Sequence, residues 1–188
     1  MSDIQLLPGD IVCTRGDSWI SRIIRLFTRT YGEAPTRVNH CELVVNGGTL
    51  EDAEVVSADR HGVAIRTILP YHAGQWLTVW RPGPSSVLYA RRAAVSALSV
   101  IGEKYPVWRL VAHALDWIIG LGGAVDVYLF RRFMRSSVVM ECSYLVAWAY
   151  EPWLSFGRPV PEISPDDIDD YCRYHPAVFA EVLPLQEV

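Results

Sequence analysis

The stretch VNHCELVVNGGTLEDAEVVSA, residues 38–58, has the pattern of two β-strands joined around the sequence NGG. Asn-Gly pairs between β-branched runs are typical of hairpins, because both residues accept the positive φ angles that such turns require. Further strands are expected at residues 8–14, 62–68 and 76–82. This succession favours an antiparallel sheet rather than parallel βαβ units.

Helical periodicity is the main signal in the rest of the chain. Residues 17–32 and 85–102 carry apolar side chains at helical spacing, and residues 142–150 form a third helical segment that ends before a proline. Ser164 is an expected N-cap for a short helix near the C-terminus. We predict a single α+β domain over residues 1–188, in which an antiparallel β-sheet packs against helices.

Composition and charge limit the classes of partner that this chain of 188 residues is expected to bind. Its apolar fraction of 51% and charged fraction of 20% are those of a core-rich globular domain. The formal net charge is −4, and the basic residues are scattered apart from two arginine pairs. A nucleic-acid binder neutralises phosphates with a continuous basic surface, which this pattern does not provide. We therefore expect a small-molecule, peptide or lipid-like substrate and no nucleic acid.

Neither a secretory signal nor a membrane span is expected. The N-terminal sequence MSDIQLLPGDIV lacks the basic and apolar segments of a signal peptide, which predicts a cytoplasmic location unless the protein is delivered or released to act on the cell envelope. The most apolar segment is an expected helical insertion at about residues 107–134, which carries Arg109, Asp116 and Asp126. One charge at the centre of a membrane span costs about 3 kcal/mol, so this insertion is expected at most to contact a membrane peripherally.

The four cysteines are expected to be free thiols, because disulfides belong to secreted chains and no signal is present. No Cys-x-x-Cys pair occurs, and His40 and Cys41 are strand neighbours whose side chains point to opposite faces. Neither a metal nor another cofactor is therefore expected. The alternative is a metal site of imidazole and carboxylate ligands, which suit zinc or manganese although their spacing matches no known pattern. Its candidate ligands are His40, Glu42, Asp52 and Glu54.

Cys142 is the candidate nucleophile. It lies in the first turn of the helix expected at residues 142–150, where unpaired backbone N–H groups and the helix dipole favour a thiolate. The same N–H groups are placed to stabilise an oxyanion. A buried structural thiol is the alternative, because cysteine is one of the most buried residue types.

His40 is the strongest candidate for a base, because it begins an apolar strand and so lies at the rim of a rigid sheet. Glu42, two residues along, projects from the same face and is placed to orient the imidazole. A strand-edge histidine without a catalytic role is the alternative. The remaining histidines lie in a turn, beside loop signals or within a helix, which suits a catalytic base less well. They are His61, His72, His113 and His175.

Six segments occur in a characteristic order along residues 8–175. They are PGDIV, the helical SRIIRLFT, the strand NHCELVV, the strand leading into Gly-Val in VVSADRHGVAIRTILPY, the motif GEKY, and the helix start ECSYLVAWAY. This order and spacing resemble the permuted NlpC-like papain-fold family, in particular its YiiX-like branch. The resemblance implies a permuted papain-like fold, in which the histidine precedes the cysteine along the chain.

The resemblance also implies roles for single residues. Cys142 is then the nucleophile and His40 the general base of a cysteine hydrolase. Tyr105, the tyrosine of GEKY, and Ser143, which follows the cysteine, are expected to line the site. The family usually has a glutamate on the second strand just before an alanine, where this sequence has Ser57.

The third catalytic group is therefore open between three residues. Glu42 is placed to substitute from the same strand face as the histidine, and Glu54 on the second strand is a weaker option. Ser57 is able to hold an imidazole by a hydrogen bond, but without a compensating charge. A further departure is Tyr144, where the family often has a glutamate after the Cys-Ser pair.

The bond cleaved is expected to be an amide in a cell-wall peptide, or an ester or thioester of a lipid-like acyl group. The apolar insertion favours an amphipathic or acylated substrate, although a core helical hairpin explains the same apolar stripe. Two alternatives have another function. One is a binding or assembly module that keeps the fold without the chemistry, and the other is a delivered antibacterial or phage-associated effector.

Overall fold

A six-stranded antiparallel β-sheet forms the centre of the structure. The structure, a computed structural model, describes residues 4–16, 21–22, 36–59, 61–104, 115–116, 118–120 and 141–188. The strands are β1 (Ile11–Arg15), β2 (His40–Asn46), β3 (Glu54–Asp59), β4 (Gly62–Thr67), β5 (Trp76–Pro82) and β6 (Phe179–Glu187). Their order across the sheet is β4-β3-β2-β1-β5-β6, and every neighbouring pair is antiparallel.

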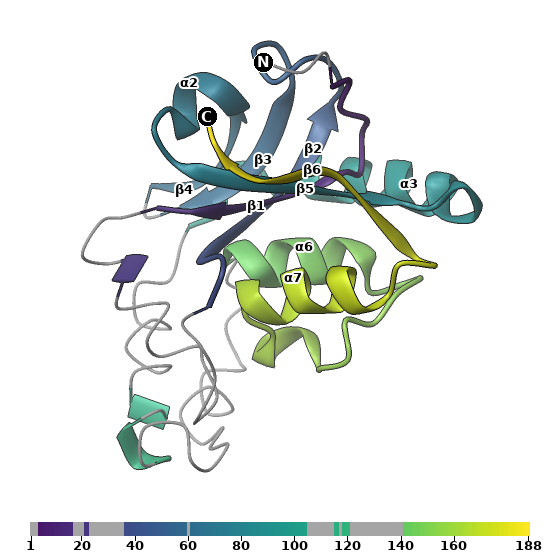
Figure 1. The fold of residues 1–188 in the computed structure, drawn as a ribbon. Helices are drawn as coiled ribbons and strands as arrows, with labels where there is room; N and C mark the ends of the chain where they lie inside the picture. The colour runs from purple at the N-terminus through teal and green to yellow at the C-terminus, as the bar shows by residue number, and fades with distance from the viewer. Residues whose placement is uncertain are drawn as a thin grey trace.

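Helices lie on both sides of this sheet. They are α2 (Ile68–His72), α3 (Val87–Leu98), α6 (Cys142–Tyr150) and α7 (Pro165–Tyr174), with the 3₁₀ turns η1 (Pro84–Ser86) and η3 (Val160–Glu162). Helices α6 and α7 lie against one face, and α2 lies on the opposite side (Figure 1). The predicted α+β class, with an antiparallel sheet packed against helices, is confirmed.

Alternation along β2 assigns its side chains to two separate cores. Cys41 and Leu43 join the core that includes α6 and α7. Val44 joins a second core, to which α2 contributes. Side chains alternate between the two faces of a strand, so those of His40 and Glu42 project from the same face as Val44. This is the face that α2 covers. The polar pair predicted from the sequence thus extends from the face that α2 covers.

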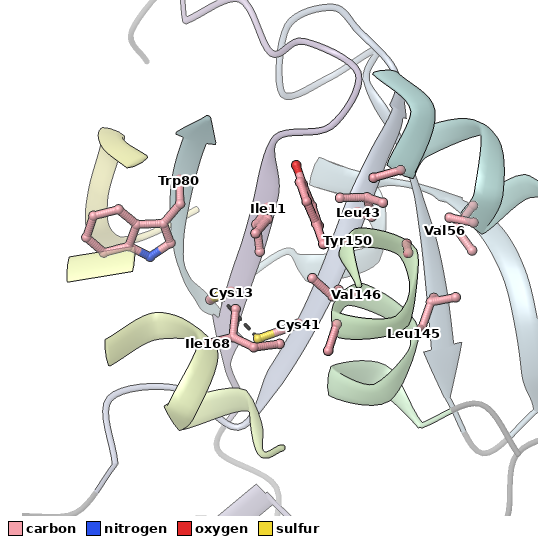
Figure 2. Close-up of a cluster of buried hydrophobic side chains, with 14 of the residues drawn as sticks. Ile11, Cys13, Cys41, Leu43, Val56, Trp80, Leu145, Val146, Tyr150 and Ile168 are labelled. Carbon is pink, nitrogen blue, oxygen red and sulfur yellow. Dashed lines mark hydrogen bonds between the residues drawn. The ribbon is translucent and has the colours of Figure 1, made fainter. Parts of the chain in front are cut away.

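The core between the sheet and α6 fixes the position of that helix. Figure 2 shows Leu145, Val146 and Tyr150 directed from α6 towards the strands, and all three are at most 2% exposed. The Tyr150 hydroxyl donates a 2.5 Å hydrogen bond to the carbonyl oxygen of Gly9, in the turn before β1. Gly9 has a φ of +95°, and a Cβ atom there would lie 2.5 Å from the Cβ of Ala90. Only glycine allows α3 to approach this turn so closely.

Most predicted elements have nearly the expected bounds. The strand predicted at 76–82 and the helix predicted at 142–150 are β5 and α6, and the predicted hairpin strands and their neighbours are β1 to β4. Ser164 caps α7 in a reciprocal capping box with Asp167. The helix predicted at 85–102 is shorter, because η1 precedes α3 and the helix ends at Leu98.

Two elements, β6 and α2, were not indicated by the sequence pattern. Each contains a proline that obscures its periodicity, Pro184 in β6 and Pro70 in α2. A proline is tolerated in β6 because this is an edge strand, and its pairing with β5 shifts register between Leu77 and Val79.

Two predicted helical segments, residues 17–32 and about 107–134, fall largely outside the described residues. Among the helices that the structure describes, none combines the length and the apolar character needed to cross a membrane. Peripheral membrane contact by the apolar insertion stays a prediction.

Candidate active site

Cys142 is the first residue of α6, as predicted from the sequence. Glu141 before it has extended backbone angles, and its carbonyl oxygen accepts the amide of Leu145 at 2.8 Å. Below this start, Val146 and Ala149 are fully buried and hold the helix against the sheet. The N–H groups of the first turn have no acceptor within the helix, and together with the helix dipole they favour an anion at the cysteine.

The other three cysteines are buried thiols in the core. All four cysteines are free, and Cys13, Cys41 and Cys172 have no exposed surface. Burial raises the pKa of each of these three thiols. The sulfurs of Cys13 and Cys41 share a 3.2 Å hydrogen bond between β1 and β2 (Figure 2). Cys142 differs from them because it lies at a helix start and keeps 8% of its surface exposed.

His40 opens β2 next to the start of α6. Burial lowers the pKa of its ring, but the charge of Cys142, a hydrogen bond with that thiol, and Glu42 raise it well above the usual value of 6.5. An imidazole in contact with a thiol is able to accept its proton and leave a thiolate–imidazolium pair. The structure therefore brings together the two residues predicted as nucleophile and base.

The Nε2 atom of His40 is held by two side chains of the sheet. It lies 2.9 Å from Oε1 of Glu42 and 3.1 Å from Oγ of Ser57. Both partners are buried, at 0% and 1% exposure. Because Nε2 is occupied, Nδ1 is the ring nitrogen left for Cys142. The resulting order of thiol, imidazole and carboxylate is the order of a catalytic triad.

Glu42 is a fully buried carboxylate with a histidine on each oxygen. Its Oε1 faces His40, and its Oε2 lies 2.7 Å from Nε2 of His72. Burial raises the pKa of Glu42, but the charge of His72 and the hydrogen bonds to both histidines lower it well below the usual value of 4.5. Glu42 is thus ionised in the folded protein, as a partner of an imidazolium must be.

His72 is the site residue that the sequence reasoning missed. It ends the five-residue helix α2 and is 2% exposed. Its position beside loop signals gave no hint of burial. The sequence did indicate indirectly that such a partner exists, because Glu42 lies inside an apolar strand. A buried carboxylate requires a cationic or hydrogen-bonding partner. Since Glu42 has two oxygens, His40 alone leaves one of them without a partner.

Helix α2, which carries His72, is tied to the neighbouring strands by polar contacts. The Tyr71 hydroxyl donates a 2.6 Å hydrogen bond to Asp59 at the end of β3, and Arg66 of β4 contacts the same carboxylate at 3.4 Å. Burial, together with the hydrogen bond to Asp59, raises the pKa of Tyr71 to about 12. The Tyr71 ring also packs edge-on against His72, with 4.7 Å between the ring centroids.

Two other predicted site residues, Glu54 and Ser143, have their polar contacts away from His40, and a third falls outside the described residues. Glu54 lies at the opposite end of the hairpin, where it accepts a hydrogen bond from Asn46. The Ser143 hydroxyl is buried and donates to the carbonyl oxygen of Ile163 at 2.9 Å. Tyr105 lies outside the described residues.

The alternative metal site is not assembled either. His40 and Glu42 contact each other, but the other two candidate ligands are paired elsewhere: Asp52 accepts from Thr49 in the connection between β2 and β3, and Glu54 accepts from Asn46. Within the described ranges, no group of three or more histidine, cysteine or acidic residues is arranged to hold a metal ion.

Comparison with protein-family models gave no match, and comparison with curated proteins found no significant similarity. The interpretation of the site therefore depends on its own geometry and on the resemblance of the short motifs. That geometry combines a cysteine at a helix start, an imidazole in contact with it, and a buried carboxylate behind the imidazole. It is a constellation suited to nucleophilic acyl transfer.

Proposed function

We propose that this protein is a cysteine hydrolase with Cys142, His40 and Glu42 as its catalytic triad. The observation that carries the proposal is the position of the His40 ring. Its Nε2 is fixed by Glu42 at 2.9 Å, and the ring lies close enough to the thiol of Cys142, at the start of α6, for that group to raise the pKa of His40. A merely structural strand-edge histidine has no need of both contacts.

The proposed reaction begins with attack of the Cys142 thiolate on a carbonyl carbon. Backbone N–H groups in the first turn of α6 stabilise the oxyanion of the tetrahedral intermediate. The His40 imidazolium then gives its proton to the leaving amine, alkoxide or thiolate, and a thioester with Cys142 remains. In the second half, His40 takes a proton from water, the hydroxide attacks the thioester, and the acid leaves as the thiolate re-forms.

The family usually has a glutamate at the position of Ser57, and serine carries no charge. Glu42 is proposed to supply the missing negative charge instead. A buried carboxylate on Nε2 fixes the orientation of the ring and stabilises the imidazolium, which is present before the first half-reaction and forms again in the second. Ser57 adds a second polar contact to the same nitrogen. The third member of the triad is thus proposed to come from the strand that also carries the histidine.

The order of the elements supports a permuted papain-like fold of the NlpC-like, YiiX-like kind. The histidine strand precedes the cysteine helix in the chain, and the helix packs against the sheet that carries the histidine. We propose an amide of a cell-wall peptide, or an ester or thioester of a lipid-like acyl group, as the bond cleaved. The apolar insertion favours the acyl substrates.

A substrate panel with mass spectrometry tests this proposal. The panel contains p-nitrophenyl esters of increasing chain length, acyl thioesters and soluble muropeptides. We expect wild-type protein to hydrolyse one class and to carry its acyl group on Cys142, and Cys142→Ala to show neither property. The matched control is Cys172→Ala, which removes a core thiol remote from the proposed chemistry and keeps the activity. Turnover by Cys142→Ala at the wild-type rate would refute the proposal.

A further inference from the structure

Glu42 and the two histidines around it form a compact buried group. Each oxygen of the carboxylate has its own imidazole, with His40 at 2.9 Å and His72 at 2.7 Å. The two imidazole rings are 6.4 Å apart and inclined by 49°. We propose that His72 is a positioning residue of the site, which keeps Glu42 ionised and oriented so that Glu42 is able to hold the His40 ring. This inference rests on the proposed function.

A charge count shows why one histidine is not enough. In the active form, the Cys142 thiolate and the Glu42 carboxylate are two negative charges beside the single positive charge of the His40 imidazolium. A net charge in a buried site is strongly disfavoured unless it is paired. A positive charge on His72 restores neutrality. Without it, the cheapest way to remove the excess charge is to protonate Glu42 or the thiolate, and either event disables the triad.

The contacts of His72 suit a doubly protonated ring. Its Nε2 faces Oε2 of Glu42 at 2.7 Å, and its Nδ1 faces the side-chain oxygen of Gln75 at 3.4 Å. Both ring nitrogens therefore meet acceptor oxygens, and only an imidazolium donates to both. The ring is also held in place by its burial and by its edge-on contact with Tyr71.

The other groups around Glu42 do not supply this charge. On β1 its register partner is Val12, and β3 contributes the neutral Ser57, which contacts His40. On α2 the other titratable group is Tyr71, whose hydroxyl donates to Asp59. From α6 the titratable group that interacts with His40 is Cys142, which supplies no positive charge in either protonation state. Among the described residues that contact Glu42, the second cation is therefore His72.

His72 acts through Glu42 and not on the substrate, so a double-mutant cycle is the appropriate test. The variants are His72→Gln, Glu42→Gln and the double variant, with His61→Gln as a control at an exposed histidine. Two readouts are measured: the pH titration of the His40 ring by ¹⁵N NMR, and the pH profile of Cys142 alkylation by iodoacetamide, followed by peptide mass spectrometry. Neither readout requires the substrate.

We expect His72→Gln to lower the pKa of His40 by about one unit and to slow alkylation at about pH 6 by about tenfold. In the Glu42→Gln background the same change should have no further effect, whereas His61→Gln should match wild type. An equal loss in both backgrounds, or no loss in the wild-type background, would overturn the inference. A purely structural role would instead change the melting temperature without changing the His40 titration.

A measurement on the wild-type protein covers the case in which His72→Gln fails to fold. The ¹⁵N shifts of the His72 ring report which nitrogens carry protons, and we expect protons on both Nε2 and Nδ1 at about pH 6. A His72 ring with one bare nitrogen at this pH would contradict the inference. Failure of the proposed function has a different signature, because Cys142 would then be alkylated no faster in wild type than in His40→Ala, whatever the NMR titrations show.

Discussion

Replacing Glu42 by glutamine is expected to destabilise the protein in a pH-dependent manner. The side chain is fully buried and contacts His40 and His72 at 2.9 and 2.7 Å. Removing one partner of a buried ion pair costs about 3–5 kcal/mol. Glutamine keeps the shape and one acceptor oxygen, so we expect a loss near the lower end, about 3 kcal/mol. In a chain of this length that lowers the melting temperature by about 9 °C.

The pH dependence of this stability difference follows from Glu42 and His40, whose pKa values are shifted in opposite directions by folding. The pKa of Glu42 is lower in the folded than in the unfolded chain, so its contribution is complete above pH 4.5 and is lost as the pH falls below that value. The pKa of His40 is raised in the folded chain, so its contribution is complete below pH 6.5 and is lost as the pH rises through the folded pKa. The difference between wild type and Glu42→Gln should therefore be greatest between these two values.

Urea unfolding across a pH series measures this difference. Glu54→Gln is the matched control, because it removes a carboxylate of the same hairpin that does not contact either histidine, and it should change stability by less than about 0.5 kcal/mol. If Glu42→Gln is as stable as wild type, or if the difference does not vary with pH, the charged triad is refuted.

Three further substitutions separate chemistry from stability. Cys142→Ala should abolish turnover while changing the free energy of unfolding by less than about 1 kcal/mol, because this side chain lies at a helix start; a large loss of stability with turnover intact would contradict its role. Ser57→Ala removes one contact to Nε2 of His40, worth about 1 kcal/mol, and should lower kcat/KM about fivefold; an unchanged rate would exclude Ser57 from the site. Ser164→Ala removes the cap of α7 and should cost about 1 kcal/mol in urea unfolding with activity intact, and an unchanged midpoint would contradict this.

The sequence was informative where one local pattern determined the structure. The NGG turn and its flanking runs predicted β2 and β3, and the apolar stripe after Cys142 predicted where α6 begins. Strand alternation placed His40 and Glu42 on one face, which the 2.9 Å contact between them bears out. Each of these inferences depends on neighbours within a few residues along the chain.

The features that the sequence did not predict depend on contacts between segments that are distant along the chain. His72 is thirty positions from Glu42 in the chain, and its burial follows from how α2 packs over the sheet. Pro184 interrupts the sequence pattern of β6, so this strand could not be recognised locally. It is stabilised by its pairing with β5. Local patterns also left Glu54 and Ser57 as rival partners for the imidazole, and only the register of the hairpin separates them.

The alkylation rate of Cys142 in wild type and in His40→Ala tests the central claim most directly. At about pH 6, iodoacetamide reacts with a thiolate far faster than with a thiol, so the rate reports whether His40 has taken the proton. Cys13 and Cys172 serve as internal controls, because burial raises the pKa of both thiols. We predict that Cys142 is alkylated at least about tenfold faster in wild type than in His40→Ala, and faster than either control. Equal rates in the two proteins would contradict the proposal that Cys142 and His40 form a catalytic pair.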